Sequence, residues 1–390
     1  MAEQTKRVYG LQFWLLCLSS FLFFSSFNMI IPELPDYLAS LGGEEYKGLI
    51  IALFALTAGL SRPFSGKLAD RIGRVPVMVV GGVVCVLAGF LYPLVASVGA
   101  FLLLRFVHGF STGFTPTGKS AYVADLVPVE RRGEAMGLLG LSGSLGMAAG
   151  PALGGLLASV YTADVMFYTS SAAAFLSVAV IWHMQETVER PQKFSLGLLR
   201  ISRREVLEPR VLAPSLVMLL TSFSFGTILT IIPDFSTHLG IQNKGLFFTS
   251  FTLSSLAIRF LAGRASDKYG RVAVLRVSSA LLTLAMLVIG LVATDTGLLL
   301  AGVLFGVATG MNSPTIYAWT IDLSHLEHRG RAMATMYIAL EAGIGFGALG
   351  SGWLYGNQSS NFSLVFWASG VFSLLAFLYL VLVVRREKEV

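Results

Sequence analysis

Charged residues are scarce in this chain of 390 residues, where Asp, Glu, Lys and Arg together make up only 13%. Soluble globular domains carry about 25%. Hydrophobic residues make up 55% of the chain, which leaves too little polar surface to cover a soluble fold. The scarcity of charge therefore excludes an ordinary soluble protein and predicts an integral membrane protein.

Cysteines and catalytic constellations are scarce too. The two cysteines, Cys17 and Cys85, fall within long apolar segments and are expected to be packed thiols rather than a disulfide. The sequence contains no cluster with metal-ligand spacing, no nucleophile arrangement and no dinucleotide fingerprint. We therefore expect neither enzyme activity, nor a metal, nor a cofactor.

One stretch, residues 113–120, satisfies the P-loop pattern of nucleotide-binding proteins. A true P-loop follows a β-strand in a soluble domain, whereas this stretch lies inside an apolar segment, so we expect no nucleotide. Its Lys119 is expected near the inner end of that segment, where it either touches a substrate or reaches the cytoplasmic interface.

The hydrophobic residues fall into twelve segments of the length that spans a bilayer as a helix. The segments are 9–31, 47–66, 75–96, 99–124, 134–158, 163–185, 212–233, 245–262, 272–293, 297–321, 332–355 and 363–384. The longest polar stretch, 186–211, is too short for a soluble domain. We predict an all-α membrane protein with a six-helix bundle in 1–185, a cytoplasmic linker in 186–211 and a second six-helix bundle in 212–390.

The basic residues are distributed unevenly between the two sides of the expected membrane. With the N-terminus inside, all but three of the 28 Lys and Arg residues fall on or near the cytoplasmic side. The exceptions are Lys47 and Lys244, outside, and Arg105, within a span. This pattern predicts that both termini are cytoplasmic, and it accounts for the basic excess without nucleic acid.

The two halves of the chain repeat each other at an offset of 197 positions. Among the repeated pairs are Gly66/Gly263, Asp70/Asp267, Gly73/Gly270, Arg74/Arg271 and Asp125/Asp322. Two related membrane bundles in one chain are typical of secondary transporters, in which the transport path lies between the halves.

The segment after the second span reads Gly66-Lys-Leu-Ala-Asp70-Arg71-Ile-Gly73-Arg74 and resembles the signature loop of the major facilitator superfamily. A weaker copy runs from Gly263 through Asp267 and Gly270 to Arg271. We expect the glycines to form a tight turn and Asp70 to lie at a neighbouring helix N-terminus. The resemblance implies that Arg74 pairs with Asp125 and that these contacts lock the outward-facing state.

The fifth span carries a second family motif, the antiporter motif G-x-x-x-G-P-x-x-G-G. It matches at every fixed position, which here are Gly146, Gly150, Pro151, Gly154 and Gly155. Most of these glycines share one helix face, which allows close approach of another helix. Within the family the motif implies exporters that exchange substrate for protons, and small-residue packing explains the glycines as well.

Three side chains are anomalous inside spans. Arg105 and His108 match the family's helix-4 arginine motif, R-x-x-q-G, with His in place of Gln. The resemblance assigns the arginine to proton coupling, while the alternative is that Arg105 snorkels to the outer interface. His108 either titrates or packs. Glu341, deep in the eleventh span, is expected either to carry a proton or to be a hydrogen-bonded packing residue.

Glu33 and Asp36 lie at the outer end of the first span, where they belong either to an outer gate, to a proton entrance or to a solvated helix end.

We therefore predict a proton-coupled exporter of a small amphipathic or lipophilic organic compound, working by alternating access. Its expected partners are that compound, protons and the lipid bilayer, with no nucleic acid and no nucleotide. We expect a monomer in the plasma membrane. One alternative is a nutrient symporter or facilitator. Another is a lipid or siderophore translocator, which an apolar lateral opening would favour.

Overall fold

The computed structural model describes residues 9–128, 131–200, 207–324 and 329–384, and within these ranges all regular structure is helical. The first half forms α1 (Leu11–Ile30), α2 (Leu34–Ser40), α3 (Lys47–Arg71), α4 (Arg74–Leu91), α5 (Val98–His108), α6 (Phe110–Leu126), α7 (Arg132–Val160) and α8 (Ala163–Trp182). The second half forms α10 (Leu212–His238), α11 (Gly245–Tyr269), α12 (Arg271–Ile289), α13 (Asp295–Leu323), α14 (Arg329–Tyr355) and α15 (Phe362–Leu382).

The described residues contain eleven helical spans long and apolar enough to cross a membrane. The helix α11 adds a twelfth when its two segments, inclined by 46°, are counted as one span. The helices α5 and α6 together form a single span, Val98–Leu126. The prediction of an all-α membrane protein with twelve apolar segments is therefore confirmed.

Several helices extend past the apolar segments at the side that the sequence predicts to be cytoplasmic. The helix α3 continues to Arg71 and α11 to Tyr269, so Gly66 and Asp70 are helical rather than part of a loop. Hydropathy cannot predict this, because backbone hydrogen bonds continue a helix into water as readily as in lipid. The turn itself consists of Ile72 and Gly73, and Gly73 adopts a φ of 137°. The copy at Gly270 has a φ of 86°.

Hydroxyl side chains fix where three helices begin at the outer side. Ser97 accepts a hydrogen bond from the backbone N–H of Ala100, and Thr294 accepts one from that of Gly297. These two caps stand 197 positions apart, and Thr162 caps α8 in the same way. Because a cap satisfies an otherwise orphaned N–H group, short outer turns suffice to connect the spans.

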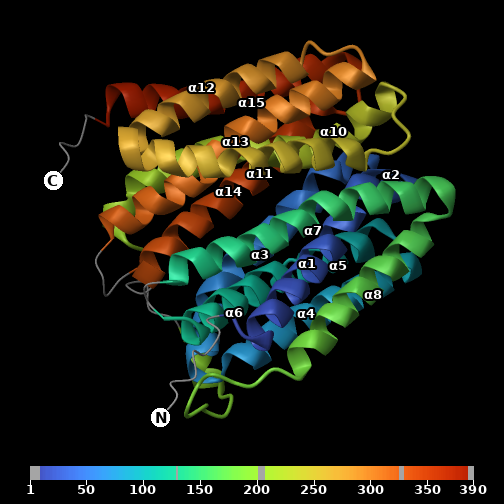
Figure 1. Ribbon diagram of the computed structural model, residues 1–390. Helices are drawn as coiled ribbons and strands as arrows, with labels where there is room; N and C mark the ends of the chain where they lie inside the picture. Colours follow the sequence, from blue (N-terminus) through green and yellow to red (C-terminus); the bar gives the residue numbers. More distant parts are fainter. Residues whose placement is uncertain (1–8, 129–130, 201–206, 325–328, 385–390) are drawn as a thin grey trace.

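The helices form two bundles that meet along two seams. Figure 1 shows α1 to α8 in one body and α10 to α15 in the other, with both ends of the chain at the same edge. The seams are formed by α3 against α14 and by α7 against α11. Any rocking of one half against the other must therefore change the contacts along these two seams.

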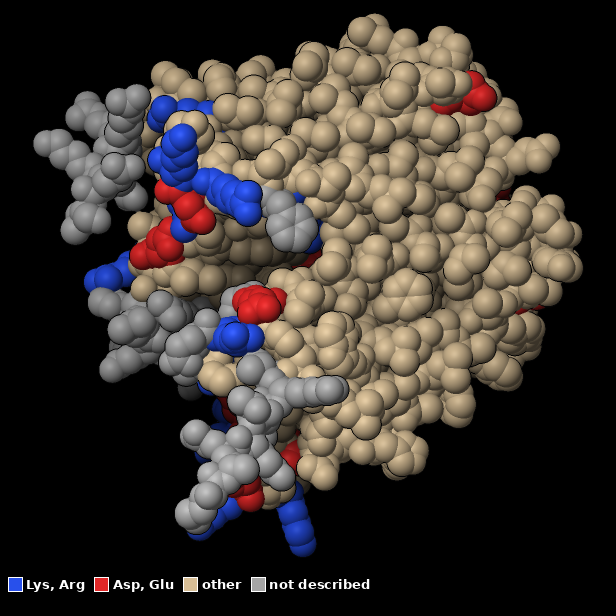
Figure 2. Space-filling view, in the orientation of Figure 1, with Lys and Arg blue, Asp and Glu red and all other residues tan. Residues whose placement is uncertain are grey.

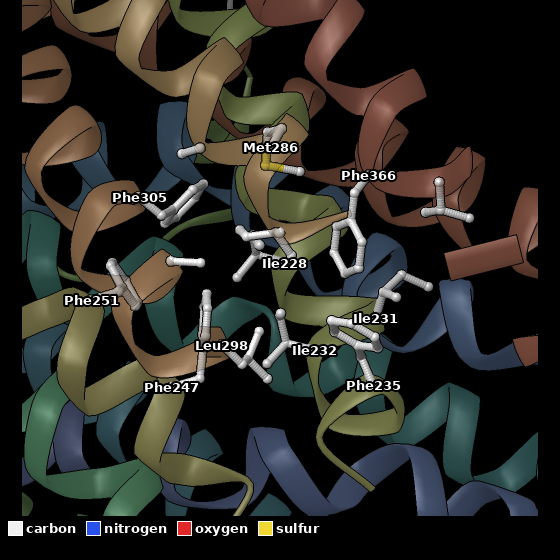
Figure 3. Close-up of a cluster of buried hydrophobic side chains, with 14 of the residues drawn as sticks. Ile228, Ile231, Ile232, Phe235, Phe247, Phe251, Met286, Leu298, Phe305 and Phe366 are labelled. Atoms are coloured by element: carbon white, nitrogen blue, oxygen red, sulfur yellow. The ribbon is translucent and has the colours of Figure 1, made fainter. Parts of the chain in front are cut away.

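The interior of the second bundle is filled by aliphatic and aromatic side chains, shown in Figure 3. The cluster draws on six helices and includes Ile228, Ile231, Ile232, Phe247, Phe251, Met286, Leu298, Phe305 and Phe366. Lipid is as apolar as these side chains, so close packing rather than exclusion from water holds helices together in a bilayer. Such an interlocked core favours movement of the bundle as one body.

The glycine face of α7 packs directly on the backbone of α1. A methyl group added at Gly150 would lie 2.5 Å from the carbonyl oxygen of Ser25, and one added at Gly154 would overlap that of Met29. Gly155 faces the opposite half instead, beside Asn243. The motif thus serves close packing within the first bundle and at the seam with α11.

This packing makes the glycines unequal in their tolerance of alanine. We expect Gly154→Ala to destabilise the protein by about 1–3 kcal/mol, because the backbones of α1 and α7 must separate. Gly140→Ala is the matched control, since Gly140 lies in the same helix with no neighbouring atom within 4 Å of the added methyl group. Thermal unfolding of the purified protein measures both, and equal melting temperatures would contradict the close approach.

Candidate functional site

The outer ends of the two halves are joined by ion pairs. Lys47 at the start of α3 binds Asp234 of α10, with 2.7 Å between Nζ and Oδ2. Lys244, just before α11, binds Asp36 and lies 3.5 Å from the carboxylate of Glu33. Burial opposes the charge of Lys244, but the two carboxylates outweigh it and raise the pKa of this lysine. Of the interpretations for Glu33 and Asp36, this geometry fits an outer gate.

Each half contributes one lysine and at least one acid to these ion pairs, so the two contacts mirror each other. Lys47 and Lys244 stand 197 positions apart, and each reaches an acid of the opposite bundle. The outer backbones also approach closely, since a methyl group added at Gly352 of α14 would lie 2.8 Å from Cα of Gly48. The structure is therefore closed at the outer side. Figure 2 shows a recess between the halves at the opposite edge, where Lys and Arg gather.

A part-buried ion pair bridges the halves farther along the seam between α3 and α14. Arg62 of α3 donates to Glu341 of α14, with 2.7 Å between Nη2 and Oε1. The guanidinium also lies 4.4 Å from the ring centre of Tyr337. Glu341 is therefore not an isolated carboxyl as the sequence suggested, because Arg62 compensates its negative charge.

The positions of Arg62 and its repeat equivalent Arg259 differ from the distribution of basic residues expected from the sequence. Both belong to the group assigned to the cytoplasmic side, yet both lie within helices and reach across the seams. Arg259 of α11 donates to the hydroxyl of Ser144 in α7 at 3.3 Å. The signal that identifies them is their recurrence at the same repeat position within apolar segments.

An apolar groove of about 660 Å³ follows the seam between α3 and α14. Among the described residues that line it, Glu341 is the one ionisable side chain. Leu56, Leu60 and Phe346 border the groove and are more than half or about half exposed, on surfaces that face lipid in a membrane. The groove therefore connects a lipid-facing surface to the part-buried ion pair.

Arg105 and His108 lie in the interior of the first bundle. Arg105 Nε donates to the carbonyl oxygen of Ile50 at 3.0 Å, and its guanidinium lies 4.6 Å from the ring centre of Phe54. His108 contacts the hydroxyl of Tyr92 at 3.3 Å. The snorkelling alternative is wrong for Arg105, which is 1% exposed, and its role in proton coupling stays a prediction.

Lys119 does not reach the cytoplasmic interface. It is 1% exposed, and its Nζ lies 5.2 Å from the ring centre of Phe23 in α1 without a hydrogen-bond partner in the described chain. The stretch around it is helical, so its backbone N–H groups bond within α6 and do not form a phosphate cradle.

The signature residues form the expected charge cluster at the cytoplasmic side, within each half. Arg74 Nη1 lies 2.5 Å from Asp70 and its Nε 3.1 Å from Asp125. The copy repeats this, with Arg271 bound to Asp267 and Asp322. Arg71 ends α3 and is exposed.

The N-terminus of α4 binds a different acid from the one expected. The carboxylate of Glu186 accepts hydrogen bonds from the backbone N–H groups of Arg74 and Val75, each at 3.0 Å. Asp70 pairs with the Arg74 side chain instead. An anion at a helix N-terminus is stabilised by the helix dipole and the free N–H groups, and Glu186 rather than Asp70 fulfils this role.

The outer ion pairs can be tested by exchanging their charges. Lys47→Glu places a second acid opposite Asp234, so we expect the outer ends of the two halves to separate. The double variant Lys47→Glu with Asp234→Lys restores the opposite charges and should restore the distance between the outer ends. Spin labels on the exposed outer residues 96 and 242, one in each half, report that distance. An unchanged distance in the single variant would show that the pair does not hold the outer side closed.

Comparison with known proteins gives consistent matches along the chain. The profile described as Major Facilitator Superfamily matches residues 16–245 and 214–390. A "Multi-drug resistance efflux pump PmrA homolog" of Lactococcus lactis subsp. lactis is 27% identical, covering 83% of each chain. The "Multi-drug resistance efflux pump PmrA" of Streptococcus pneumoniae serotype 4 is 28% identical over 77% of this chain and 78% of its own.

The fold is shared with solved structures. The human organic anion transporter MFSD10 (TETRAN) superimposes with a TM-score of 0.73 at 21% identity, covering 97% of this chain and 100% of that one. A D-xylose-proton symporter superimposes with a TM-score of 0.76 at 16% identity, covering 94% and 96%.

Proposed function

Because this chain belongs to the Major Facilitator Superfamily and is thus a multi-pass secondary transporter, we propose that it exports a small amphipathic or lipophilic organic compound in exchange for protons. The names of its relatives, multi-drug efflux pumps at 27% and 28% identity, support the direction of transport. We place it in the plasma membrane as a monomer with both termini cytoplasmic.

The ion pair between Arg62 and Glu341 carries this proposal. It joins the two halves inside the membrane, in a state closed to the outside. A proton on Glu341 removes the attraction, so proton binding and this contact oppose each other. In this cycle the proton leaves Glu341 when the pair with Arg62 forms, and we propose that it exits through the recess at the opposite edge (Figure 2).

The outer carboxylates fit the other end of this cycle. Glu33 and Asp36 lie where protons enter, and both are held by Lys244 while the outer side is closed. In the proposed cycle, opening the outer side separates these charges and gives Glu33, whose side chain is 13% exposed, access to external protons. The antiporter motif on α7 supports exchange over joint uptake.

Glu341→Gln tests the role of this carboxyl. We expect pH-driven efflux from proteoliposomes to fall to the level of protein-free liposomes, because the amide cannot release a proton, while substrate binding persists. Glu45→Gln is the matched control, as Glu45 is exposed at the outer side. Unaltered pH-driven efflux in Glu341→Gln would confine Glu341 to packing.

We assign the charge cluster of Asp70, Arg74 and Asp125 to the opposite conformation, in which the transporter is open to the outside. The Asp70 side chain is 69% exposed while it pairs with Arg74, so it is available to the other half when the inner ends meet. We propose that this cluster, with its copy around Asp267 and Arg271, stabilises the state open to the outside.

Asp70→Asn should therefore reduce transport severely and leave the melting temperature nearly unchanged. The variant should also increase thiol labelling of cysteines introduced at the cytoplasmic ends of α3 and α14, because the inner ends spend more time apart. Asp164→Asn, an exposed acid at the outer side, is the control. Transport at the wild-type rate in Asp70→Asn would contradict the proposal that this cluster stabilises the state open to the outside.

The apolar groove favours a second candidate, a translocator of lipid-like molecules. An acyl chain fits a groove of about 660 Å³ lined by aliphatic residues along a seam that faces lipid. Reconstitution separates the candidates, since a translocator moves a headgroup-labelled lipid between leaflets in a protein-dependent manner, whereas the exporter moves a soluble compound across the bilayer.

A further inference from the structure

The two seams carry equivalent arginines with unequal partners. Arg62 and Arg259 stand 197 positions apart, as do Ser144 and Glu341. Each arginine reaches the equivalent position of the opposite half, so the contacts are exchanged reciprocally. At one seam the acceptor is a carboxylate, and at the other it is only a hydroxyl.

This difference leaves Arg259 without a counter-charge. No Asp or Glu of the described chain lies within 4.0 Å of its guanidinium, and its buried Nε has no hydrogen-bond partner there. Arginine keeps its charge under all ordinary conditions. A charge removed from water without a counter-ion is costly, so the Arg259 site favours the arrival of an anion.

The Arg62 seam provides the internal comparison. Its buried Nε also lacks a partner, yet its Nη2 binds Glu341 and its face lies against the Tyr337 ring. Taken together, the two arginines and one glutamate leave an excess of one positive charge between the halves, among the described residues. That excess lies at Arg259.

The surroundings of Arg259 suit an organic anion better than a bare ion. The ring centre of Tyr317 in α13 lies 5.7 Å from that of Tyr337, and the Tyr337 ring lies against the guanidinium of Arg62, the repeat equivalent of Arg259. The pair of rings offers an apolar surface between the halves. A guanidinium binds a carboxylate or related oxyanion with two parallel hydrogen bonds.

We propose that Arg259 binds an anionic group of the transported compound, with the apolar body of that compound on Tyr317 and Tyr337. The substrate is then an organic anion or a zwitterion, and not a simple lipophilic cation. The inference rests on the proposed function only in assuming that the transport path passes between the halves. It identifies Arg259 as the residue that determines specificity for charge.

Equilibrium binding to the purified full-length protein tests this directly. The probes are a panel of aromatic and alkyl carboxylates, each with its neutral amide and its amine analogue. We expect the carboxylates to bind more tightly than their amides, and Arg259→Gln to weaken carboxylate binding by roughly 10- to 100-fold, the range for a lost charge-assisted hydrogen bond. Arg264→Gln, an exposed site on the same helix, is the control for charge.

Ser144→Glu gives a second readout that does not depend on a chosen probe. The new carboxylate reproduces the partner that Glu341 provides at the other seam, so the variant should melt at a higher temperature and lose its preference for carboxylates. In an Arg259→Gln background the same substitution should not stabilise. Preference for amines, no carboxylate preference across the panel, or unchanged binding in Arg259→Gln would overturn the proposal.

The binding experiment and the transport experiment can fail independently, so the anion site at Arg259 and the proposed proton-coupled export are tested separately. Carboxylate-selective binding that depends on Arg259, without efflux driven by a pH gradient, retains the anion site and removes the proton exchange. Efflux driven by a pH gradient, with amine-selective binding, removes the anion site and retains the exchange.

Discussion

A charge inside a bilayer is costly, and the contact between Arg62 and Glu341 lets two such charges compensate each other. Each member comes from a different half, so neither bundle neutralises its own charge. The two halves are thereby joined by an ion pair that a proton on Glu341 would remove. We propose that this couples the relative position of the bundles to protonation, which packing contacts alone cannot do.

The rest of the fold concentrates movement at the seams where these charges lie. Within each bundle the helices interlock through glycine faces, such as that of α7 on α1, and through dense apolar cores. Between the bundles the contacts of the basic side chains are paired by the repeat, with Lys47 and Lys244 at one end and Arg62 and Arg259 deeper. Duplication has thus placed equivalent charges on both seams, and in the proposed mechanism the difference between Glu341 and Ser144 makes one seam responsive to protons and leaves the other open to an anion.

The sequence predicted the spans and the division into two related halves, because hydropathy and the internal repeat are patterns that extend over many residues. The apolar segments predicted the spans, and the motifs predicted the pairing of Arg74 with Asp125. Partners distant in sequence were not predictable. Nothing local pairs Glu341 with Arg62 across 279 positions, and Glu186 at the start of α4 has no motif of its own. The sequence left two positions open for Lys119 and for Arg105, because a one-dimensional pattern does not distinguish the interior of a bundle from its surface.

The central claim is that protonation of Glu341 weakens the closure of the outer side, and a distance measurement tests it most directly. Spin labels on residues 96 and 242 would be measured at alkaline pH, where the outer carboxylates keep their lysine partners. The account predicts that Glu341→Gln shows a larger fraction of the long, outward-open distance than the wild-type protein at that pH. Identical distance distributions in the two proteins would contradict it.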